Sequence, residues 1–558
     1  MKKIFLPIFL LQFTFKLLAV AYLSNIFQDN MILQREKPLK IWGSGDVGDK
    51  VTLRIEDQED STIVSTEGKW NIILAPLYTS KEPIIFEFES DENIQRFENV
   101  LVGDIWFCSG QSNMALTVNY SENADEEIQN SKNLDIRLFT VPQSYNTGQS
   151  ESQDIAGYWE LCEPENVIDF SATAYFFGKE LDAELDIPIG LINSSYGSSM
   201  IESWTSIEGN IYVEGGDQYI EDVYNGQYPD LEEENYPSAL FNTMIFPFAN
   251  FSIKGFIWYQ GERNTRTDEA CYKYRFQLPA LINDWRNVWN ENELPFYFVQ
   301  LPNFNIEYNW ALIRESMEVA ATNTANTEIA ITIDIGESDN IHPANKQDVG
   351  KRLALLALNN TYHKDIIFSG PKYKNNSVNN SRIIIEFENI YEGFKASGDI
   401  ITGFEISENN KIFYDADTYI SGNNIVVNSI YVSKPVAVRY CWSSDPKCNL
   451  YNSAELPLRP FKTNINNYNL PSEVQLYQNY PNPFNPITTI SFLNKFPENI
   501  NLSVYNAMGE KITTLIDNNL NAGFHEVKFD GMKLQSGVYF YTLLSENNKL
   551  TKKMVITK

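Results

Sequence analysis

The chain has 558 residues, of which 43% are hydrophobic, and it carries a formal net charge of −30 at pH 7. This length predicts about two to four domains with packed cores. The strong negative charge argues against nucleic acid or anionic membrane as a partner, because both are negatively charged and would repel the chain.

Residues 1–21 have the pattern of a secretory signal peptide. A basic start at residues 2–3 precedes an apolar stretch that ends at Leu18, and residues 19–21 are the small residues of a cleavage site. A membrane anchor is the alternative, but two polar residues interrupt the stretch and leave it short for a span. No later segment is apolar enough to cross a bilayer. We therefore expect a protein that is exported through the periplasm.

The next regions predict a small β domain followed by an α/β domain. Residues 22–100 carry short apolar stretches separated by turns, as in 51–55 and 84–88. From 101 to 364, strand and helix patterns alternate. The expected strands are 105–108, 187–193, 254–259, 295–301 and 328–335, and the expected helices are 171–184, 271–289 and 345–359. This alternation predicts the α/β class, with a mainly parallel sheet covered on both faces.

Two further β regions complete the chain. Residues 365–467 are strand-rich, and residues 468–558 open with a proline-punctuated string at 480–486 that cannot be helical. The sequence therefore predicts β domains on both sides of the α/β domain.

Five cysteines are present, and none of them belongs to a cluster with metal-ligand spacing. Cys441 and Cys448 flank a turn-rich stretch, so a disulfide closing that loop is favoured over two unpaired thiols, since export permits disulfides. Cys108 lies in an expected core strand and is interpreted as a small buried hydrophobic residue.

Ser112 is the first candidate for chemistry. The apolar run 105–108 ends abruptly at the small polar cluster 109–113, so Ser112 falls at the carboxyl end of an expected strand. In open α/β sheets this edge is where ligands and reactions are found. Turn serines are common, however, and a serine alone would more often be structural.

A nucleophilic serine needs a base, and the chain offers only His342, His363 and His525. Of these, His342 follows the expected strand 328–335 and so lies beyond the same sheet edge as Ser112. Asp339, three residues earlier, is predicted to orient the imidazole. Asp334 and Glu337 are rivals for that role.

Two more loops on this edge offer donors for a developing oxyanion. After strand 187–193, the N–H of Gly197 or Ser198 is a candidate. After strand 254–259, the side-chain amides of Gln260 and Asn264 are candidates. Each of these loops alone would more often be an ordinary turn. The shared edge favours a site.

The nucleophile segment 110–114 lacks the second glycine of the α/β-hydrolase elbow. A serine near the start of the α/β region and an Asp-x-x-His pair near its end resemble the SGNH (GDSL-like) hydrolases. More specifically, the chain resembles the sialate O-acetylesterase family across roughly residues 25–465. The blocks that carry this resemblance are, in order, 29–35, 108–114, 242–245, 258–262, 284–286, 341–346, 438–440, 449–452 and 460–463.

The resemblance implies that Ser112 is the nucleophile, His342 the base and Asp339 its partner. Gly197 and the 260–264 loop would form the oxyanion side. It implies no metal and no organic cofactor. The chain departs from the family where Ser198 and Ser199 stand for glycine and threonine, and where Arg263 stands for serine beside Glu262.

These departures affect two expectations. The serines at 198 and 199 leave open which N–H is the oxyanion donor. The arginine at 263 suggests that Arg263, together with Glu262, contacts the substrate. A guanidinium can pair bidentately with a sialate carboxylate, although an ordinary structural ion pair is the more common role for such an arginine.

Residues 476–558 resemble a type A sorting domain of the bacterial type IX secretion system. The resemblance rests on the string at 480–486, on 505–509, on 537–541 and on the basic end of the chain. It implies the type IX machinery as a partner and secretion to the cell surface or beyond. A carbohydrate-binding or adhesive β module is the alternative.

The sequence thus predicts a secreted esterase that removes O-acetyl groups from sialic acids through an acetyl-enzyme. An esterase acting on xylan or another acetylated glycan is one alternative. A carbohydrate-binding or adhesive surface protein without activity is another, which the presence of serine, aspartate and histidine together disfavours.

Overall fold

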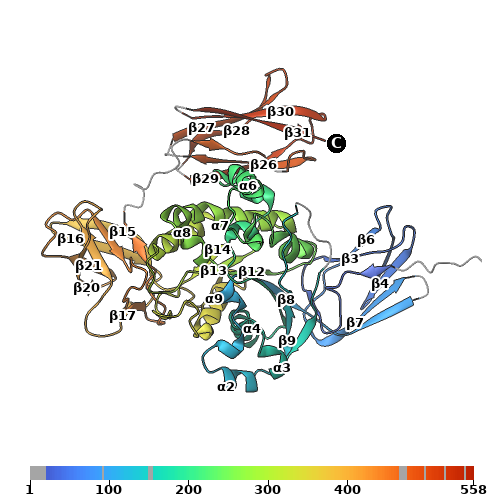
Figure 1. The fold of residues 1–558 in the computed structure, drawn as a ribbon, viewed down its shortest axis with the longest axis horizontal. Coiled ribbons are helices and arrows are strands. Elements are labelled where there is room, and N and C mark those ends of the chain that lie inside the picture. Colours follow the sequence, from blue (N-terminus) through green and yellow to red (C-terminus); the bar gives the residue numbers. More distant parts are fainter. Residues whose placement is uncertain are drawn as a thin grey trace, which may run out of the picture.

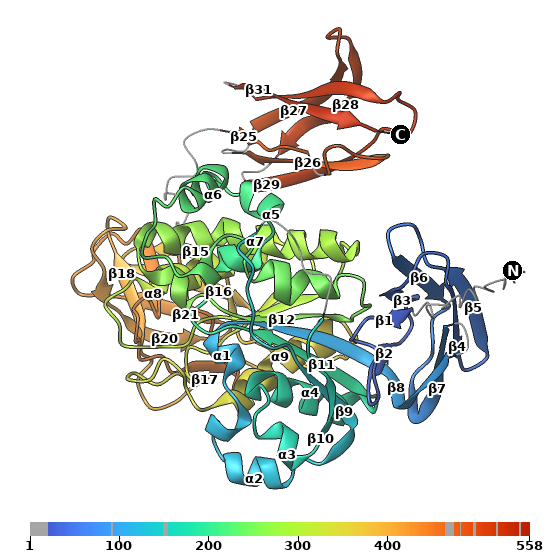
Figure 2. The same cartoon turned by 45° about the vertical axis from the view of Figure 1, so that its right-hand side comes forward.

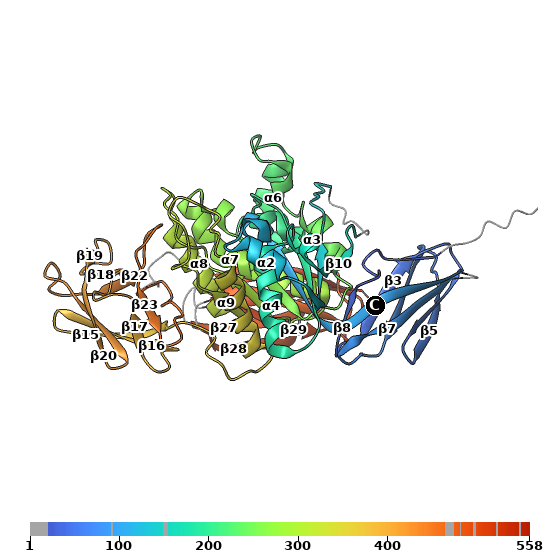
Figure 3. The ribbon, with the colours of Figure 1, turned by 90° about the horizontal axis from the view of Figure 1, so that it is seen from below.

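An α/β domain stands at the centre of the molecule (Figure 1). The computed structural model describes residues 21–90, 93–148, 155–463, 474–479, 481–494, 498–520, 523–545 and 548–557. The predicted signal peptide therefore lies outside the described residues, apart from Ala21. Seen from below, the N-terminal β domain and the β-rich segment lie at opposite ends of the α/β domain (Figure 3).

The N-terminal domain consists of two groups of strands. One is a sheet of β1 (Tyr22–Leu23), β3 (Leu39–Ser44) and β6 (Lys69–Leu74). The other contains β2 (Ile32–Gln34), β4 (Lys50–Ile55), β5 (Gln58–Ile63), β7 (Ser80–Ser90) and β8 (Asn93–Gly110). Buried and exposed residues alternate along β6, because one face covers the core and the other meets solvent.

Strand β8 joins this domain to the α/β domain (Figure 2). Its first part pairs antiparallel with β7, and its end lies between β11 (Ile189–Ser195) and β12 (Gly255–Tyr259), parallel to both. Every residue of β8 from Val100 onward is buried. The predicted strand 105–108 is thus the end of a much longer one, which is continuous across the predicted boundary at residue 100.

The central sheet has the order β10-β9-β11-β8-β12-β13-β14, and only β10 runs antiparallel to its neighbour. The bounds of the outer strands are β9 (Asn133–Thr140), β10 (Trp159–Cys162), β13 (Phe296–Val299) and β14 (Thr327–Ala330). All residues of β12 and β13 are buried, as expected for a parallel sheet with both faces covered. The predicted α/β class with flanking β domains is confirmed.

Helices cover both faces of this sheet (Figure 1). The pair α4 (Ala172–Leu185) and α9 (Lys346–Asn360) lies on one face, and α7 (Asp268–Trp289) and α8 (Trp310–Asn323) lie on the other. A side chain caps the start of each helix: Ser171, Asn345, Thr267 and Asn309, respectively.

Short helices occupy the loops between these elements. They are α1 (Ser112–Ala115), η1 (Val118–Tyr120), α2 (Ala124–Gln129), α3 (Pro164–Val167), η2 (Ile201–Trp204), α5 (Ile207–Ile211), α6 (Gly216–Tyr224), η3 (Glu233–Asn235), η4 (Phe241–Ile245), η5 (Phe246–Phe248) and η6 (Glu262–Thr265).

The sequence did not predict β9, β10 or α8, and it extended β14 too far. In β9 and α8, buried polar residues interrupt the apolar pattern: Arg137 in the strand, and Arg314 and Glu315 in the helix. Strand β14 ends at Ala330. Ile331 and Ile333, which follow it, are buried but lie outside any strand, and a buried loop and a buried strand share the same apolar pattern.

The β-rich segment contains three small sheets. The first sheet has the strand order β15 (Lys372–Asn379), β16 (Arg382–Glu388), β21 (Asn424–Asn428) and β20 (Asp417–Ser421). The second has the order β19 (Tyr414–Asp415), β18 (Phe404–Ser407), β22 (Ala437–Tyr440) and β24 (Phe461–Lys462). The third pairs β17 (Phe394–Ala396) with β23 (Leu450–Asn452). A disulfide joins Cys441 to Cys448 in the loop after β22, while Cys108, Cys162 and Cys271 are free and buried.

The C-terminal unit forms two sheets around a hydrophobic core of its own. One sheet holds β25 (Gln475–Leu476), β26 (Ile487–Asn494) and β29 (Gly523–Asp530), and the other holds β28 (Lys511–Leu520), β27 (Glu498–Asn506), β30 (Gly537–Leu544) and β31 (Lys549–Ile556). Among the described residues, no helix has both the length and the apolar character needed to cross a membrane.

Asp104 fastens β8 at the junction of the two domains. Its side chain is completely buried, accepts a hydrogen bond from Gln34 Nε2 at 2.7 Å and forms an ion pair with Arg35, whose Nε lies 3.0 Å from Oδ1. Lys254 Nζ is 3.8 Å from its second oxygen. A buried carboxylate is stable only while such partners compensate for the water it has lost.

We expect Arg35→Ala to lower the free energy of unfolding by about 3 kcal/mol, because it leaves the Asp104 carboxylate buried without its main cation. Urea unfolding monitored by tryptophan fluorescence measures the change. Arg96→Ala is the control: Arg96 is 74% exposed and pairs with Glu87, so less than about 1 kcal/mol is expected. Equal losses in the two variants would contradict the role given to Asp104.

Candidate active site

Ser112 stands at the carboxyl edge of the central sheet, where β8 turns into the short helix α1. The turn depends on Gly110, which has φ +141°, and a Cβ there would come within 2.1 Å of the Tyr259 carbonyl oxygen. The N–H of Gln111 donates to the same carbonyl at 2.9 Å. Only glycine allows β8 to approach β12 this closely, and this contact aims Ser112 outward from the edge.

His342 lies on the loop between β14 and α9, and its Nε2 is 2.8 Å from Ser112 Oγ. The two predicted residues, 230 positions apart in the chain, are therefore in hydrogen-bond contact. Partial burial, together with the nearby charge of Lys346, lowers the pKa of His342 below its ordinary value. At neutral pH the imidazole is then mostly uncharged and able to accept a proton.

Asn113 and Lys346 hold the backbone on both sides of His342. Asn113 Nδ2 donates to the Ile341 carbonyl at 3.0 Å, and Lys346 Nζ donates to the Pro343 carbonyl at 2.6 Å. Lys346 Nζ also donates to Asn113 Oδ1 at 2.9 Å, which ties the two anchors together. The residue after the nucleophile thus fixes the loop that carries the base.

A buried carboxylate completes this network. Glu262 Oε1 accepts a 2.6 Å hydrogen bond from Asn113 Nδ2, and burial raises the pKa of Glu262. Burial lowers the pKa of Lys346 to about 7, an effect that Glu262 and Glu337 only partly offset. A cation and a carboxylate that share one asparagine therefore lie directly behind the Ser112–His342 pair.

Within the described part of the chain, Asp339 does not make the predicted contact with His342. The Asp339 side chain is exposed and makes no hydrogen bond to the imidazole. Neither rival replaces it, because Asp334 pairs with Arg352 at 2.6 and 2.8 Å and Glu337 accepts hydrogen bonds from Asn340 and Ala344. The acidic residues of this loop are thus either exposed or hydrogen-bonded to other groups.

Gly197 is the oxyanion candidate that the structure places beside Ser112. A Cβ on Gly197 would lie 3.9 Å from the Ser112 Cβ. Within the described part of the chain, neither the Gly197 N–H nor the Ser112 N–H, at the start of α1, has a hydrogen-bond acceptor. The Ser112 N–H was missed from the sequence, because its exposure depends on where α1 begins.

The side-chain amides of Gln260 and Asn264, which the sequence offers as oxyanion donors, are engaged in internal hydrogen bonds. Both are buried, and Gln260 Nε2 already donates to Ser199 O at 2.9 Å and to Asn264 Oδ1 at 2.8 Å. Asn264 Nδ2 donates to Glu202 Oε2 at 3.0 Å. Buried amides must satisfy their hydrogen bonds internally, so these two residues support the loop after β12 instead.

Arg263 forms an ion pair in the structure. Its Nη2 lies 2.6 Å from Glu232 Oε2. Glu262, in contrast, belongs to the network behind the nucleophile. The two residues predicted together as substrate contacts therefore face different partners, and Arg263 already has a carboxylate partner in Glu232.

A serine hydroxyl that is hydrogen-bonded to an imidazole at this edge of an α/β sheet is typical of hydrolases that act through a covalent intermediate. A family model described as carbohydrate esterase, sialic acid-specific acetylesterase, matches residues 102–359. A second, described as secretion system C-terminal sorting domain, matches residues 478–557. The chain is thus a carbohydrate esterase that carries a secretion tail.

Known proteins agree with this class. The chain is 28% identical to sialate O-acetylesterase of Homo sapiens over 492 residues, which cover 78% of this chain and 91% of that protein. It is 30% identical to the Pongo abelii enzyme over 388 residues, or 62% and 72% of the two chains. A crystal structure of a carbohydrate acetylesterase from Xanthomonas citri superposes with a TM-score of 0.73 at 32% identity, covering 80% of this chain and 100% of that one.

The chain therefore belongs to the sialate O-acetylesterase family and is a carboxylic ester hydrolase. Its C-terminal unit is a type IX sorting domain, which directs the protein to the cell surface or the extracellular space.

We expect Lys346→Met to raise the pKa of His342, because it removes a positive charge that opposes protonation of the imidazole. The acid limb of kcat/KM for 4-nitrophenyl acetate should then move to higher pH. Histidine NMR measures the pKa directly, since the chain has only three histidines. Lys351→Met, on the exposed face of α9, should leave both the pKa and the acid limb unchanged. A downward shift in Lys346→Met would contradict this electrostatic role.

Proposed function

We propose that this esterase has an SGNH-type hydrolase domain that removes O-acetyl groups from sugars, with O-acetylated sialic acid as its substrate. Ser112 is the nucleophile and His342 the general base. The observation that carries the proposal is the 2.8 Å contact between Ser112 Oγ and His342 Nε2 at the carboxyl edge of the sheet. The predicted signal peptide and the sorting domain together would deliver the enzyme to glycans outside the cell.

In the first half of the reaction, Ser112 Oγ attacks the acetyl carbonyl while His342 Nε2 accepts the hydroxyl proton. The carbonyl oxygen becomes an oxyanion, which the N–H groups of Gly197 and Ser112 are free to receive. The C–O bond to the sugar then breaks. His342 returns its proton to the leaving sugar oxygen, and the acetyl group remains on Ser112.

In the second half, water takes the place of the sugar. His342 removes a proton from the water, whose oxygen attacks the acetyl-serine carbonyl. Acetate leaves as the proton passes to Ser112 Oγ, and the enzyme is restored. Both halves need an uncharged imidazole at the start, and burial and Lys346 favour that state.

Among the residues that the structure describes, no carboxylate forms a hydrogen bond or ion pair with the His342 ring. In triad hydrolases a carboxylate fixes the ring and stabilises the imidazolium. Here Asn113 and Lys346 donate hydrogen bonds to the backbone carbonyls on either side of His342. The Asn340 side chain accepts a 3.0 Å hydrogen bond from the backbone N–H of His342. The position of His342 is therefore fixed by hydrogen bonds to its backbone, whereas in a triad it is fixed by a hydrogen bond to the imidazole ring.

The Arg263–Glu232 pair favours a second candidate substrate. With its charge balanced by Glu232, Arg263 offers less attraction to a sialate carboxylate, and a neutral acetylated sugar, such as a unit of xylan or another glycan, suits the site better.

Ser112→Ala and His342→Ala should each lower kcat/KM for an acetyl ester by at least about 1,000-fold, since each removes a group that acts on the reacting atoms. Release of acetate and of 4-nitrophenol measures the change. Asp339→Asn should cost less than about tenfold, because Asp339 does not touch His342. Near-normal turnover in a folded Ser112→Ala variant would refute the mechanism, and a loss in Asp339→Asn equal to that in His342→Ala would restore a triad.

Substrate choice is tested with Arg263→Ala on free O-acetylated sialic acid and on an acetylated neutral sugar. If Arg263 leaves Glu232 to bind the sialate carboxylate, kcat/KM for sialate should fall at least about tenfold further than that for the neutral sugar. Glu232→Gln is the matched variant and should raise sialate turnover, because it frees the guanidinium. Equal effects on both substrates would favour the neutral sugar.

A further inference from the structure

A hollow of about 680 Å³ is lined in part by the loops that follow β12 and β13, and neither Ser112 nor His342 belongs to its lining. Three stretches form its walls: residues 265–268, 307–311 and 442–444. The first two leave the carboxyl ends of β12 and β13, the same sheet edge that presents Ser112. The third belongs to the β-rich segment, so the hollow opens between that segment and the α/β domain.

The lining combines charged groups, hydroxyls and aromatic rings. Arg266 supplies a cation, Asp268 and Glu307 supply carboxylates, and none of the three forms an ion pair with any residue that the structure describes. Tyr308 is 43% exposed, and Trp442 is partly exposed at the far wall. Polar groups with unused hydrogen-bonding capacity therefore stand beside two aromatic rings.

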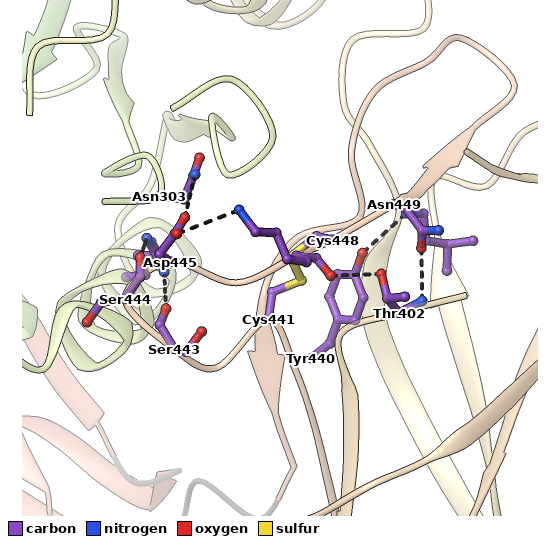
Figure 4. The surroundings of a disulfide bond; sticks show 12 residues. Asn303, Thr402, Tyr440, Cys441, Ser443, Ser444, Asp445, Cys448 and Asn449 are labelled. Atoms are coloured by element: carbon purple, nitrogen blue, oxygen red, sulfur yellow. Dashed lines mark hydrogen bonds and ion pairs between the residues drawn. A yellow bond between two sulfur atoms is a disulfide. The ribbon is translucent and has the colours of Figure 1, made fainter. Parts of the chain in front are cut away.

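The wall at 442–444 is fixed in place. The disulfide between Cys441 and Cys448 closes its loop, and Asp445 accepts a hydrogen bond from Asn303 at 2.8 Å (Figure 4). Asp445 also accepts a hydrogen bond from Ser338 at 2.7 Å. Such a loop loses little conformational freedom when a ligand binds, which favours affinity.

Buried Arg314 also holds the wall at residues 442–444 through hydrogen bonds. Its guanidinium donates to the carbonyls of Ser443 and Ser444, at 2.7 and 2.8 Å, and also to those of Leu301 and Pro302. The loop from β13 and the disulfide loop are thereby bound into one rigid surface.

We infer that this hollow binds further sugar units of the glycan that carries the acetyl group. The inference rests on the proposed function. A sugar ring offers hydroxyls that both donate and accept, which match one guanidinium and two carboxylates, and an apolar face that packs on an aromatic ring. Two carboxylates against one cation disfavour a polyanion. The ligand is therefore a chain of neutral sugars next to the acetylated unit.

The test compares small and glycan-linked substrates. Arg266→Ala and Tyr308→Ala should each lower kcat/KM about 3- to 10-fold on a mucin bearing O-acetylated sialic acid or on acetylated xylan, the loss expected for one hydrogen bond or one packing contact. Neither variant should change kcat/KM for 4-nitrophenyl acetate, because the hollow does not include the reacting groups. Controls are Arg382→Ala and Tyr431→Ala, exposed residues outside the hollow.

Several results would overturn the inference. These are equal kcat/KM of the unaltered enzyme for free and glycan-linked acetyl sugars, no turnover of either glycan, or glycan turnover that is unchanged in both variants. Failure of the proposed function is distinct, since it would show as 4-nitrophenyl acetate turnover that survives Ser112→Ala.

Discussion

The site depends on the burial of one strand, β8. It begins at the edge of the N-terminal domain, becomes a central strand of the α/β sheet and delivers Ser112 at its end. Because β11 and β12 pair with β8 residue by residue, a shift in its register would move Gly110 out of contact with Tyr259 and misplace the nucleophile. The Asp104 contacts with Gln34 and Arg35 resist such a shift at the domain junction.

Electrostatics behind the nucleophile add a second constraint. Lys346 is buried at a cost that its nearby carboxylates only partly offset, as its lowered pKa of about 7 shows. That cost is compatible with folding because Asn113 and the Pro343 carbonyl accept its hydrogen bonds. Burial of the imidazole and, after it, this nearby charge lower the pKa of His342. Lys346 thus contributes both to the position of the base and to its pKa.

The sequence predicted the parts of the site that follow from strand ends. Ser112, His342 and Gly197 each come directly after or near an expected strand, and the parallel arrangement brings them to one edge. The sequence does not indicate the parts of the site that depend on which way a side chain faces. Asp339 is close to His342 in the chain, but the turn points it to solvent, and Gln260 and Asn264 are turned inward into a polar network. Spacing along a loop does not determine which way a side chain faces.

The sequence did not single out Asn113 and Lys346 as site residues. Both lie inside the blocks 108–114 and 341–346 that carried the family resemblance, yet an asparagine and a lysine have no distinctive chemistry until their partners are known. Helix α8 was missed for a related reason. Its buried Arg314 and Glu315 weaken the apolar periodicity, and Arg314 is buried because it binds four carbonyls from two loops.

The β-rich segment belongs to the working enzyme rather than serving as a spacer before the sorting domain. Asp445 in its disulfide loop accepts a hydrogen bond from Ser338, four residues before His342, so a residue outside the α/β domain steadies the loop that carries the base. The C-terminal unit, in contrast, has its own hydrophobic core. A unit with a core of its own could in principle fold alone. The sorting domain thus has a core separate from that of the esterase, and the ring of its Tyr477 contacts Tyr212 edge-on, with the centroids 6.4 Å apart.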